Sequence, residues 1–214
     1  MAGPGTIASL QGISVRAGAT HILRDITLNV EPGEAVGVFG TNGAGKTTLL
    51  RLLATLLKPA TGTGTILGAD LSGDERYEVR PRIGYVGHVP GLYPEMTLDE
   101  NLSFIASAMG IDHEAVLTSL TAVGLGGAAD RRAEVCSHGM QRRAEFARIL
   151  MTEPEFLLLD EPHSALDGNA VDLVDDLVRR TVTAGGAAVL VSHDRSRVEK
   201  LATYSVEIKG GTLS

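Results

Sequence analysis

The sequence predicts an α/β fold in which helices cover both faces of a parallel sheet. Three short apolar runs, at residues 35–39, 156–159 and 187–191, have the length and continuous hydrophobicity of strands that are buried on both faces. Helical patterns alternate with these strands, which favours parallel connections between them. The length of 214 residues suits one domain, or one domain with an inserted subdomain.

Composition narrows the class of protein further. Hydrophobic residues make up 43% and charged residues 21%, which is typical of a globular chain. The net charge of −7 leaves no overall basic surface for wrapping a nucleic-acid backbone, although it allows a local basic patch. The single cysteine, Cys136, rules out a disulfide framework within the chain and fits a reducing compartment.

No segment of the sequence has the character of a membrane anchor or a secretory signal. No apolar run approaches the roughly 18–20 residues that cross a bilayer, and the N-terminus lacks a basic stretch followed by an apolar one. We therefore expect a cytoplasmic chain that contacts a membrane only through a partner that spans it.

The elements are predicted in chain order from their periodicity and turn signals. The first 30 residues read as an antiparallel β region, with short alternating runs at residues 6–10, 13–15 and 26–30. Glycines 12 and 18 and the pair Pro32-Gly33 supply turn signals between and after these runs. After the first buried strand, a leucine-rich helix is expected from about Lys46 to Leu57, and Pro59 follows it.

The middle of the chain is mostly helical and forms an insertion between two strands. Helices are expected near residues 98–109, 113–123 and 138–151, between strands at 83–86 and 156–160. A further amphipathic helix at 169–183 precedes the last buried strand. We therefore expect residues 1–214 to form a single domain, of which about 88–150 include a helical subdomain.

A glycine-rich turn after the first buried strand carries the pattern G-x-x-x-x-G-K-[ST] at every fixed position. Glycines let the backbone curl so that its N–H groups converge on phosphates, and the following helix adds its positive end. Lys46 offers a charge to the β- and γ-phosphates of ATP, and the Thr47 hydroxyl can bind Mg²⁺. A plain strand–turn–helix connection is the alternative, but the flanking strand and helix are those that the motif requires. The predicted nucleotide-binding residues are Gly40, Thr41, Asn42, Gly43, Ala44, Gly45, Lys46, Thr47 and Thr48.

Three further residues, at two places in the chain, are candidates for catalysis or ligand binding. Asp160 and Glu161 end a buried strand, which places them at the crevice where α/β sheets bind ligands. Asp160 can hold Mg²⁺, and Glu161 can activate the attacking water as a general base. Ser137 suits the N-cap of the next helix, where a second anion site is possible, although an ordinary helix cap explains that residue alone.

Together these motifs resemble the ATP-binding subunits of ABC transporters, over essentially the full length of the chain. Five motifs follow one another in the family's order, and the first of them is Walker A, which the glycine-rich turn matches. The others are the signature at 136–141, Walker B at 157–162, the D-loop Ser164-Ala165-Leu166-Asp167 and the switch-histidine segment Val191-Ser192-His193-Asp194.

The resemblance implies a P-loop NTPase fold of the ABC ATPase type and a head-to-tail dimer of two ATP-binding subunits. ATP on Walker A of one subunit would be closed over by Ser137 and Gly139 of the other, and His193 would contact the γ-phosphate. A transmembrane permease would dock on residues 88–102, and His88 stands where the family has a glutamine that links Mg²⁺ to that partner. No nucleic-acid partner is implied.

Three departures from the family pattern stand out. His138 and Met140 replace a glycine and a glutamine of the signature, His88 replaces the Mg²⁺-linking glutamine, and Ala17 lies where an aromatic residue would stack on adenine. Loss of a stacking contact weakens base binding by about 1–3 kcal/mol. Residues 87–97, with Glu100-Asn101-Leu102 and the variant signature, resemble the haem-exporter ATP-binding subunit of cytochrome c maturation.

Three functions stay open from the sequence. The leading one is a transport ATPase, either of the haem-exporter type or of another small exporter of drugs or lipids. The second is a soluble ABC-type ATPase acting on ribosomes or DNA, although this chain has neither tandem domains nor a long coiled-coil insertion. The third is a non-hydrolysing regulatory module, suggested by the departures at positions 17, 88, 138 and 140.

Overall fold

The computed structural model describes residues 5–163 and 168–214, so the predicted D-loop, Ser164-Ala165-Leu166-Asp167, lies outside the described residues. The chain forms two compact units. The first, which we call the sheet unit, comprises Met1–Tyr85, Pro154–Pro162 and Val178–Ser214. The second, which we call the helical unit, comprises Val86–Glu153 and His163–Leu177.

The main sheet has six strands in the order β10-β9-β3-β8-β7-β6. Strands β9, β3, β8 and β7 run parallel, which confirms the predicted parallel sheet, and β10 is antiparallel to its neighbour β9. The central strands are buried along their whole length because helices and the second sheet cover them. The strand bounds are β3 Ala35–Gly40, β6 Ile83–Val86, β7 Phe156–Asp160, β8 Ala187–Val191, β9 Tyr204–Lys209 and β10 Thr212–Leu213.

A second, antiparallel sheet has the order β2-β1-β4-β5 and confirms the predicted β region at the start of the chain. The runs at 6–10 and 13–15 are not separate strands, because Gly12 lies inside β1 with a φ of +61°. The register of β1 against β2 shifts between Leu10 and Ile13, so the glycine forms an irregularity and not a turn. The bounds are β1 Ala8–Ala17, β2 Thr20–Val30, β4 Thr61–Ile66 and β5 Ala69–Asp70.

Helix α1 covers Lys46–Leu53 and is shorter than the predicted span of 46–57. It ends because Thr55 takes up a left-handed conformation with a φ of +59°. Arg80 stabilises this end by donating hydrogen bonds to the Thr55 carbonyl at 2.9 Å and to its hydroxyl at 3.1 Å. The leucines at 56 and 57 therefore lie beyond the helix, although their apolar pattern continues that of the helix.

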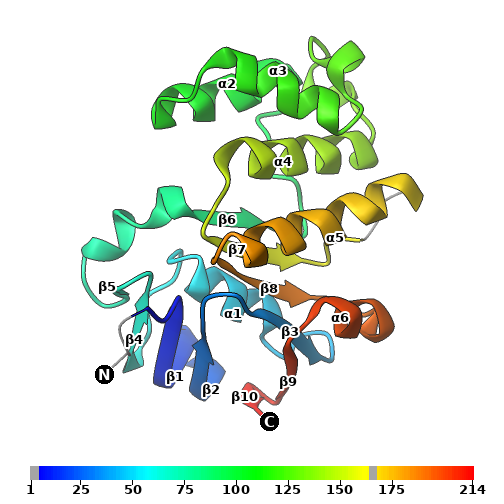
Figure 1. The fold of residues 1–214 in the computed structure, drawn as a ribbon. Helices are drawn as coiled ribbons and strands as arrows, with labels where there is room; N and C mark the ends of the chain where they lie inside the picture. The colour runs from blue at the N-terminus through cyan, green and yellow to red at the C-terminus, as the bar shows by residue number, and fades with distance from the viewer. Residues whose placement is uncertain (1–4, 164–167) are drawn as a thin grey trace. The chain divides into compact units, whose positions relative to one another are not determined.

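In the helical unit, α2 (Leu98–Met109), α3 (His113–Ala122) and α4 (His138–Thr152) pack against one another, as Figure 1 shows. All three agree with the predicted helices to within one residue at each end. Helix α2 starts at a capping box, in which Thr97 and Glu100 each accept from the other's backbone N–H. The remaining helices are α5 (Gly168–Thr183) and α6 (Arg195–Leu201). None of the helices within residues 5–163 and 168–214 is both long and apolar enough to cross a bilayer.

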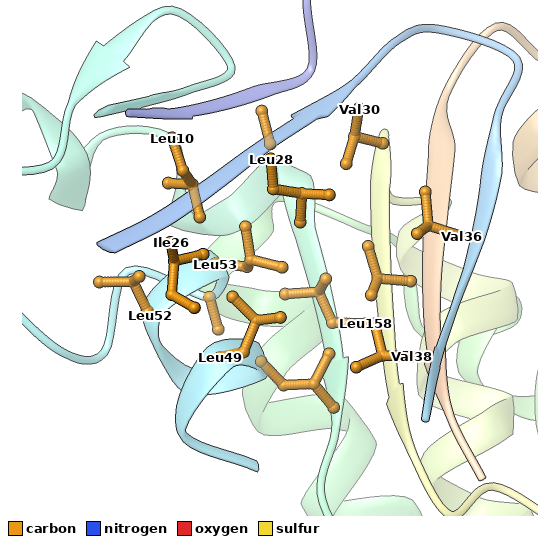
Figure 2. Close-up of a cluster of buried hydrophobic side chains, with 14 of the residues drawn as sticks. Leu10, Ile26, Leu28, Val30, Val36, Val38, Leu49, Leu52, Leu53 and Leu158 are labelled. Carbon is orange, nitrogen blue, oxygen red and sulfur yellow. The ribbon is translucent and has the colours of Figure 1, made fainter. Parts of the chain in front are cut away.

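The main hydrophobic core of the sheet unit lies between the two sheets and around α1 (Figure 2). Leucines 49, 52 and 53 of α1 point into it, toward Ile26 and Leu28 of β2 and toward Val38 of β3. These side chains are at most 5% exposed. The core thus fixes α1 directly behind the loop that precedes it, which is the loop of the candidate site.

Tyr204 offers a pH prediction in the sheet unit. Its hydroxyl donates a hydrogen bond to the Asn29 carbonyl, and burial, with the nearby charges of Glu34 and Glu31, raises its pKa from 10.0 to about 12. Since the unfolded phenol ionises first, we expect the stability that Tyr204 contributes to fall as the pH rises from 10 to 12. In an absorbance titration at 295 nm, the tyrosine ionisation at the highest pH should be absent from the Tyr204→Phe variant. A wild-type titration in which all four tyrosines ionise near pH 10 would contradict this expectation.

Candidate nucleotide-binding and hydrolysis site

The loop between β3 and α1 has the curled backbone that phosphate binding requires. Gly40, Gly43 and Gly45 take φ values of +149°, +77° and +111°. A Cβ atom on Gly40 would lie 2.5 Å from the Ile208 carbonyl oxygen, so a larger residue would push the loop away from β9. Helix α1 begins at once after Gly45, and its first backbone N–H groups therefore open toward the loop.

Lys46 lies under this loop and is only 8% exposed. Its Nζ donates to the Gly40 carbonyl at 2.7 Å and to the Thr41 carbonyl at 3.0 Å. The ammonium group thus stays close to the loop at a place where its charge can reach phosphate oxygens. Of the other predicted loop residues, Thr41 and Asn42 are exposed, Ala44 is buried and Thr48 is half-buried.

Two oxygen ligands suited to Mg²⁺ meet beside the loop. The Thr47 hydroxyl donates to Asp160 Oδ2 at 2.7 Å, across 113 residues of sequence. Asp160 is the last residue of β7 and is almost completely buried. A hydroxyl and a carboxylate are hard oxygen donors, so the pair fits a magnesium ion that binds through few protein ligands and several waters.

Glu161 is held in an unusual conformation immediately after β7. Its φ is +50°, in the left-handed region that non-glycine residues rarely adopt, and its N–H donates to the Val191 carbonyl at 2.8 Å. The His193 N–H donates to Glu161 Oε2 at 3.2 Å. Glu161 Oε1 lies 3.2 Å from His193 Nε2, within ion-pair distance, but it accepts no hydrogen bond of good geometry among the described residues. Glu161 Oε1 is thus a buried carboxylate oxygen that accepts no hydrogen bond among the described residues.

The predicted signature lies in the helical unit and starts α4. Ser137 is the N-cap of this helix, and its hydroxyl accepts from the Met140 N–H at 3.3 Å. Gln141 anchors the approach to the helix by donating to the Ala133 carbonyl at 2.6 Å. Ser137 and Gly139 therefore present a helix N-terminus, as the sequence predicts for an anion site.

His88 is exposed and lies just after β6 in a segment without regular structure. Its backbone carbonyl accepts a hydrogen bond from Arg142 of α4 at 2.9 Å. Ala17, at the end of β1, is exposed and pairs with Thr20 across the hairpin, so it presents no ring for stacking. No cluster of three or more metal-binding side chains exists within the described ranges.

Sequence reasoning missed three polar residues that shape the helical unit. Arg142 and Glu145 form a buried ion pair on α4, with 3.2 Å between Nη1 and Oε2. Asn101 is buried on α2, and its side chain bonds to the backbone of Tyr93, Met96 and Thr97. A charged residue at position 145, between Ala144 and the apolar Phe146-Ala147, was the signal that could have revealed the ion pair.

Comparison with known proteins agrees with this geometry. The family model for the ABC transporter matches residues 23–164, which is more than half of the chain. The cytochrome c biogenesis ATP-binding export protein CcmA 2 of Cupriavidus metallidurans is 37% identical over 190 residues, covering 87% of this chain and 89% of that protein. The daunorubicin/doxorubicin resistance ATP-binding protein DrrA of Streptomyces peucetius is 35% identical over 198 residues, covering 91% of this chain and 60% of that protein.

A solved structure shares the fold over almost the whole chain. It is the dimeric structure of a post-hydrolysis state of the ATP-binding cassette MJ0796 bound to ADP and Pi. It superposes with a TM-score of 0.84 and 26% identity, covering 97% of this chain and 96% of that one. The phosphate loop, the acidic strand end and these similarities lead to one conclusion: the chain belongs to the ABC transporter family and is an ATP-binding subunit that hydrolyses ATP.

Proposed function

We propose that this chain powers export across the cytoplasmic membrane as one of two identical ATP-binding subunits, in a transporter of the haem-exporter type linked to cytochrome c maturation. The observation that carries the catalytic part is the meeting of Thr47, Asp160 and Glu161 beside the phosphate loop. The 37% identity to a cytochrome c biogenesis export protein supports the type of transporter.

In this proposal the loop residues 40–48 bind the phosphates of ATP. Backbone N–H groups of the loop and of the first turn of α1 donate to phosphate oxygens. Lys46, which here donates to two loop carbonyls, turns its ammonium group toward the β- and γ-phosphates. Thr47 and Asp160 hold Mg²⁺, directly or through its waters, and the ion supplies charge neutralisation for the transferred phosphate.

Glu161 acts as the general base in the hydrolytic step. Its carboxylate takes a proton from the attacking water as that water's oxygen bonds to the γ-phosphorus and the bond to ADP breaks. The hydrogen bond from the His193 N–H steadies the carboxylate. The His193 side chain is 62% exposed, which leaves it able to reach a γ-phosphate once ATP is bound.

A second copy of the chain completes each site. Ser137 and Gly139 at the start of α4 offer a hydroxyl and backbone N–H groups to the ATP that lies on the partner's phosphate loop. The dimeric state of the ADP- and Pi-bound cassette that shares this fold supports this assembly. His138 and Met140 leave the backbone donors in place, so the altered signature is compatible with the role.

An apolar patch on the helical unit is the proposed docking surface for a transmembrane permease. Val89, Tyr93 and Phe104 are 75%, 55% and 57% exposed. The rings of Tyr93 and Phe104 contact each other edge to face, with 5.9 Å between their centroids. The patch lies in and beside residues 88–102, which the family resemblance assigns to the permease. Such a contact would hold the chain at the cytoplasmic face of the membrane through its partner.

Affinity purification from membranes tests this docking surface. We expect a tagged full-length chain to co-purify with a membrane-spanning protein. The Tyr93→Ser/Phe104→Ser variant should recover at least tenfold less of that protein, because the apolar contact area is removed. Leu117→Ser serves as the control, since Leu117 is a comparably exposed apolar residue of α3 in the same unit. Equal recovery from all three proteins would contradict the assigned surface.

The identity of the purified partner decides between the remaining functions. A partner that retains haem, seen by its absorbance, supports the haem-exporter type. A partner that exports drugs or lipids would replace that type with the alternative exporter, as the resemblance to DrrA allows. Recovery with nucleic acid in place of membrane protein would overturn the transport function. ATP hydrolysis should be measured with the partner bound, because the partner can complete the active state.

A further inference from the structure

A buried polar pair on α4 holds a segment of the helical unit that belongs to no helix or strand. Arg142 is completely buried, and its two terminal nitrogens donate to the Gly87 carbonyl and, at 2.9 Å, to the His88 carbonyl. Glu145 is 3% exposed and accepts from the Gly91 N–H at 3.0 Å. The pair thus contacts the main chain of residues 87–91 at three points.

Packing alone does not call for charged residues at these two positions. The neighbouring buried positions of α4 are filled by Ala144, Phe146, Ala147 and Ile149. Burying two charges costs free energy that their mutual attraction only partly offsets, so an apolar pair would serve the core equally well. Burial raises the pKa of the Glu145 carboxyl, while the Gly91 N–H and the guanidinium groups of Arg142 and Arg148 oppose that rise. What an apolar pair could not do is bond to three backbone groups of an irregular segment.

The same helix carries the signature at its start. Ser137 caps α4, and Arg142 and Glu145 follow within its first three turns. A helix transmits displacement along its length because its hydrogen-bonded backbone is stiff compared with a loop. Any displacement of Ser137 therefore moves the backbone that Arg142 and Glu145 hold, including the backbone of His88.

We propose that Arg142 and Glu145 are positioning residues that fix the segment carrying His88 to the signature helix, so that closure of Ser137 on a partner's ATP repositions His88. This inference rests on the proposed function, from which it takes the role of Ser137. The role of His88 is the one that the family resemblance implies, a link between Mg²⁺ and the permease. The two residues act through that segment and contact neither nucleotide nor metal.

Hydrogen–deuterium exchange of the full chain tests whether Arg142 and Glu145 hold residues 87–91, without relying on ATP turnover. The parent carries Glu161→Gln, so that it holds Mg·ATP without hydrolysing it. We expect Glu145→Leu to speed exchange in peptides covering residues 87–94 by about tenfold in the absence of nucleotide, because a charge-assisted hydrogen bond is lost. Mg·ATP should slow exchange there in the parent but not in the Glu145→Leu protein, which still binds ATP.

Two matched variants separate positioning from general stability. Glu145→Gln keeps an oxygen acceptor for the Gly91 N–H and should restore the parent's exchange pattern. Glu134→Leu makes the same apolar change at an exposed glutamate of the same unit and should behave as the parent. If Glu145→Leu alone proves unstable, Arg142→Leu/Glu145→Leu removes both charges together and should show the same loss of response.

The results that would overturn the proposal are specific. Unchanged exchange at residues 87–94 in nucleotide-free Glu145→Leu would show that Glu145 does not hold this segment. A full Mg·ATP response in that variant, or in the double variant, would show that His88 is positioned otherwise. A parent that stays monomeric with Mg·ATP would count against the proposed dimer. The comparison of the nucleotide-free parent with nucleotide-free Glu145→Leu would still test whether Glu145 holds residues 87–91.

Discussion

Replacing Glu161 by glutamine should leave Mg·ATP binding within about threefold of the parent and lower ATP turnover by about 10²–10⁴-fold. The glutamine side chain has the same shape and can still accept the His193 N–H through its carbonyl oxygen. It cannot accept a proton from water at neutral pH, so the step that the carboxylate serves is lost. Phosphate release and equilibrium ATP binding measure the two quantities separately.

The same variant should reveal the dimer. Because hydrolysis is blocked, ATP persists between two copies, and we expect size-exclusion chromatography with Mg·ATP to show a dimer where the nucleotide-free protein is a monomer. Glu199→Gln is the matched control, since this exposed glutamate of α6 makes only a surface contact with Arg195. If Glu161→Gln turns over ATP as fast as Glu199→Gln, Glu161 is not the base. If it remains monomeric with its permease present and Mg·ATP saturating, the two-subunit closure is wrong.

The sequence predicted those parts of the fold that depend on local patterns. The buried strands β3, β7 and β8 were identifiable because short, continuous apolar runs are typical of strands that are buried on both faces. The phosphate loop was identifiable because its glycines and Lys46 are fixed by the shape of a single turn. Their meeting with Asp160 also followed, since the carboxyl ends of parallel strands lie along one edge of the sheet, although β8 separates β3 from β7.

Features set by tertiary contacts could not be predicted in the same way. The end of α1 depends on Arg80, which is 25 residues away from Thr55 and outweighs the leucine pattern that continues to Leu57. Strands β4 and β5 have few apolar residues, and β4 is defined by its pairing with β1. The contacts of Arg142 with Gly87 and His88 span more than 50 residues, and no local periodicity marks them.

Replacing Lys46 by alanine should weaken ATP binding by about 10²–10⁴-fold. Its ammonium group would otherwise make charge-assisted hydrogen bonds to two phosphate groups, each contributing about 1.5–3 kcal/mol. In the nucleotide-free protein the same group donates to the Gly40 and Thr41 carbonyls, so the substitution also removes two contacts that shape the loop. Isothermal titration with Mg·ATP measures the affinity, and thermal unfolding without nucleotide measures the effect on the loop.

A second lysine, Lys58, provides the control for the Lys46→Ala variant. Lys58 is exposed and lies beyond the end of α1, so Lys58→Ala removes the same charge from the same unit without touching the loop. We expect that variant to bind Mg·ATP as the wild type does. Lys46→Arg keeps the charge, but its guanidinium is larger and planar, and we therefore expect it to recover only part of the affinity. Wild-type affinity in Lys46→Ala would mean that the loop binds phosphate through its backbone alone, and the assignment of Lys46 to the β- and γ-phosphates would then be wrong.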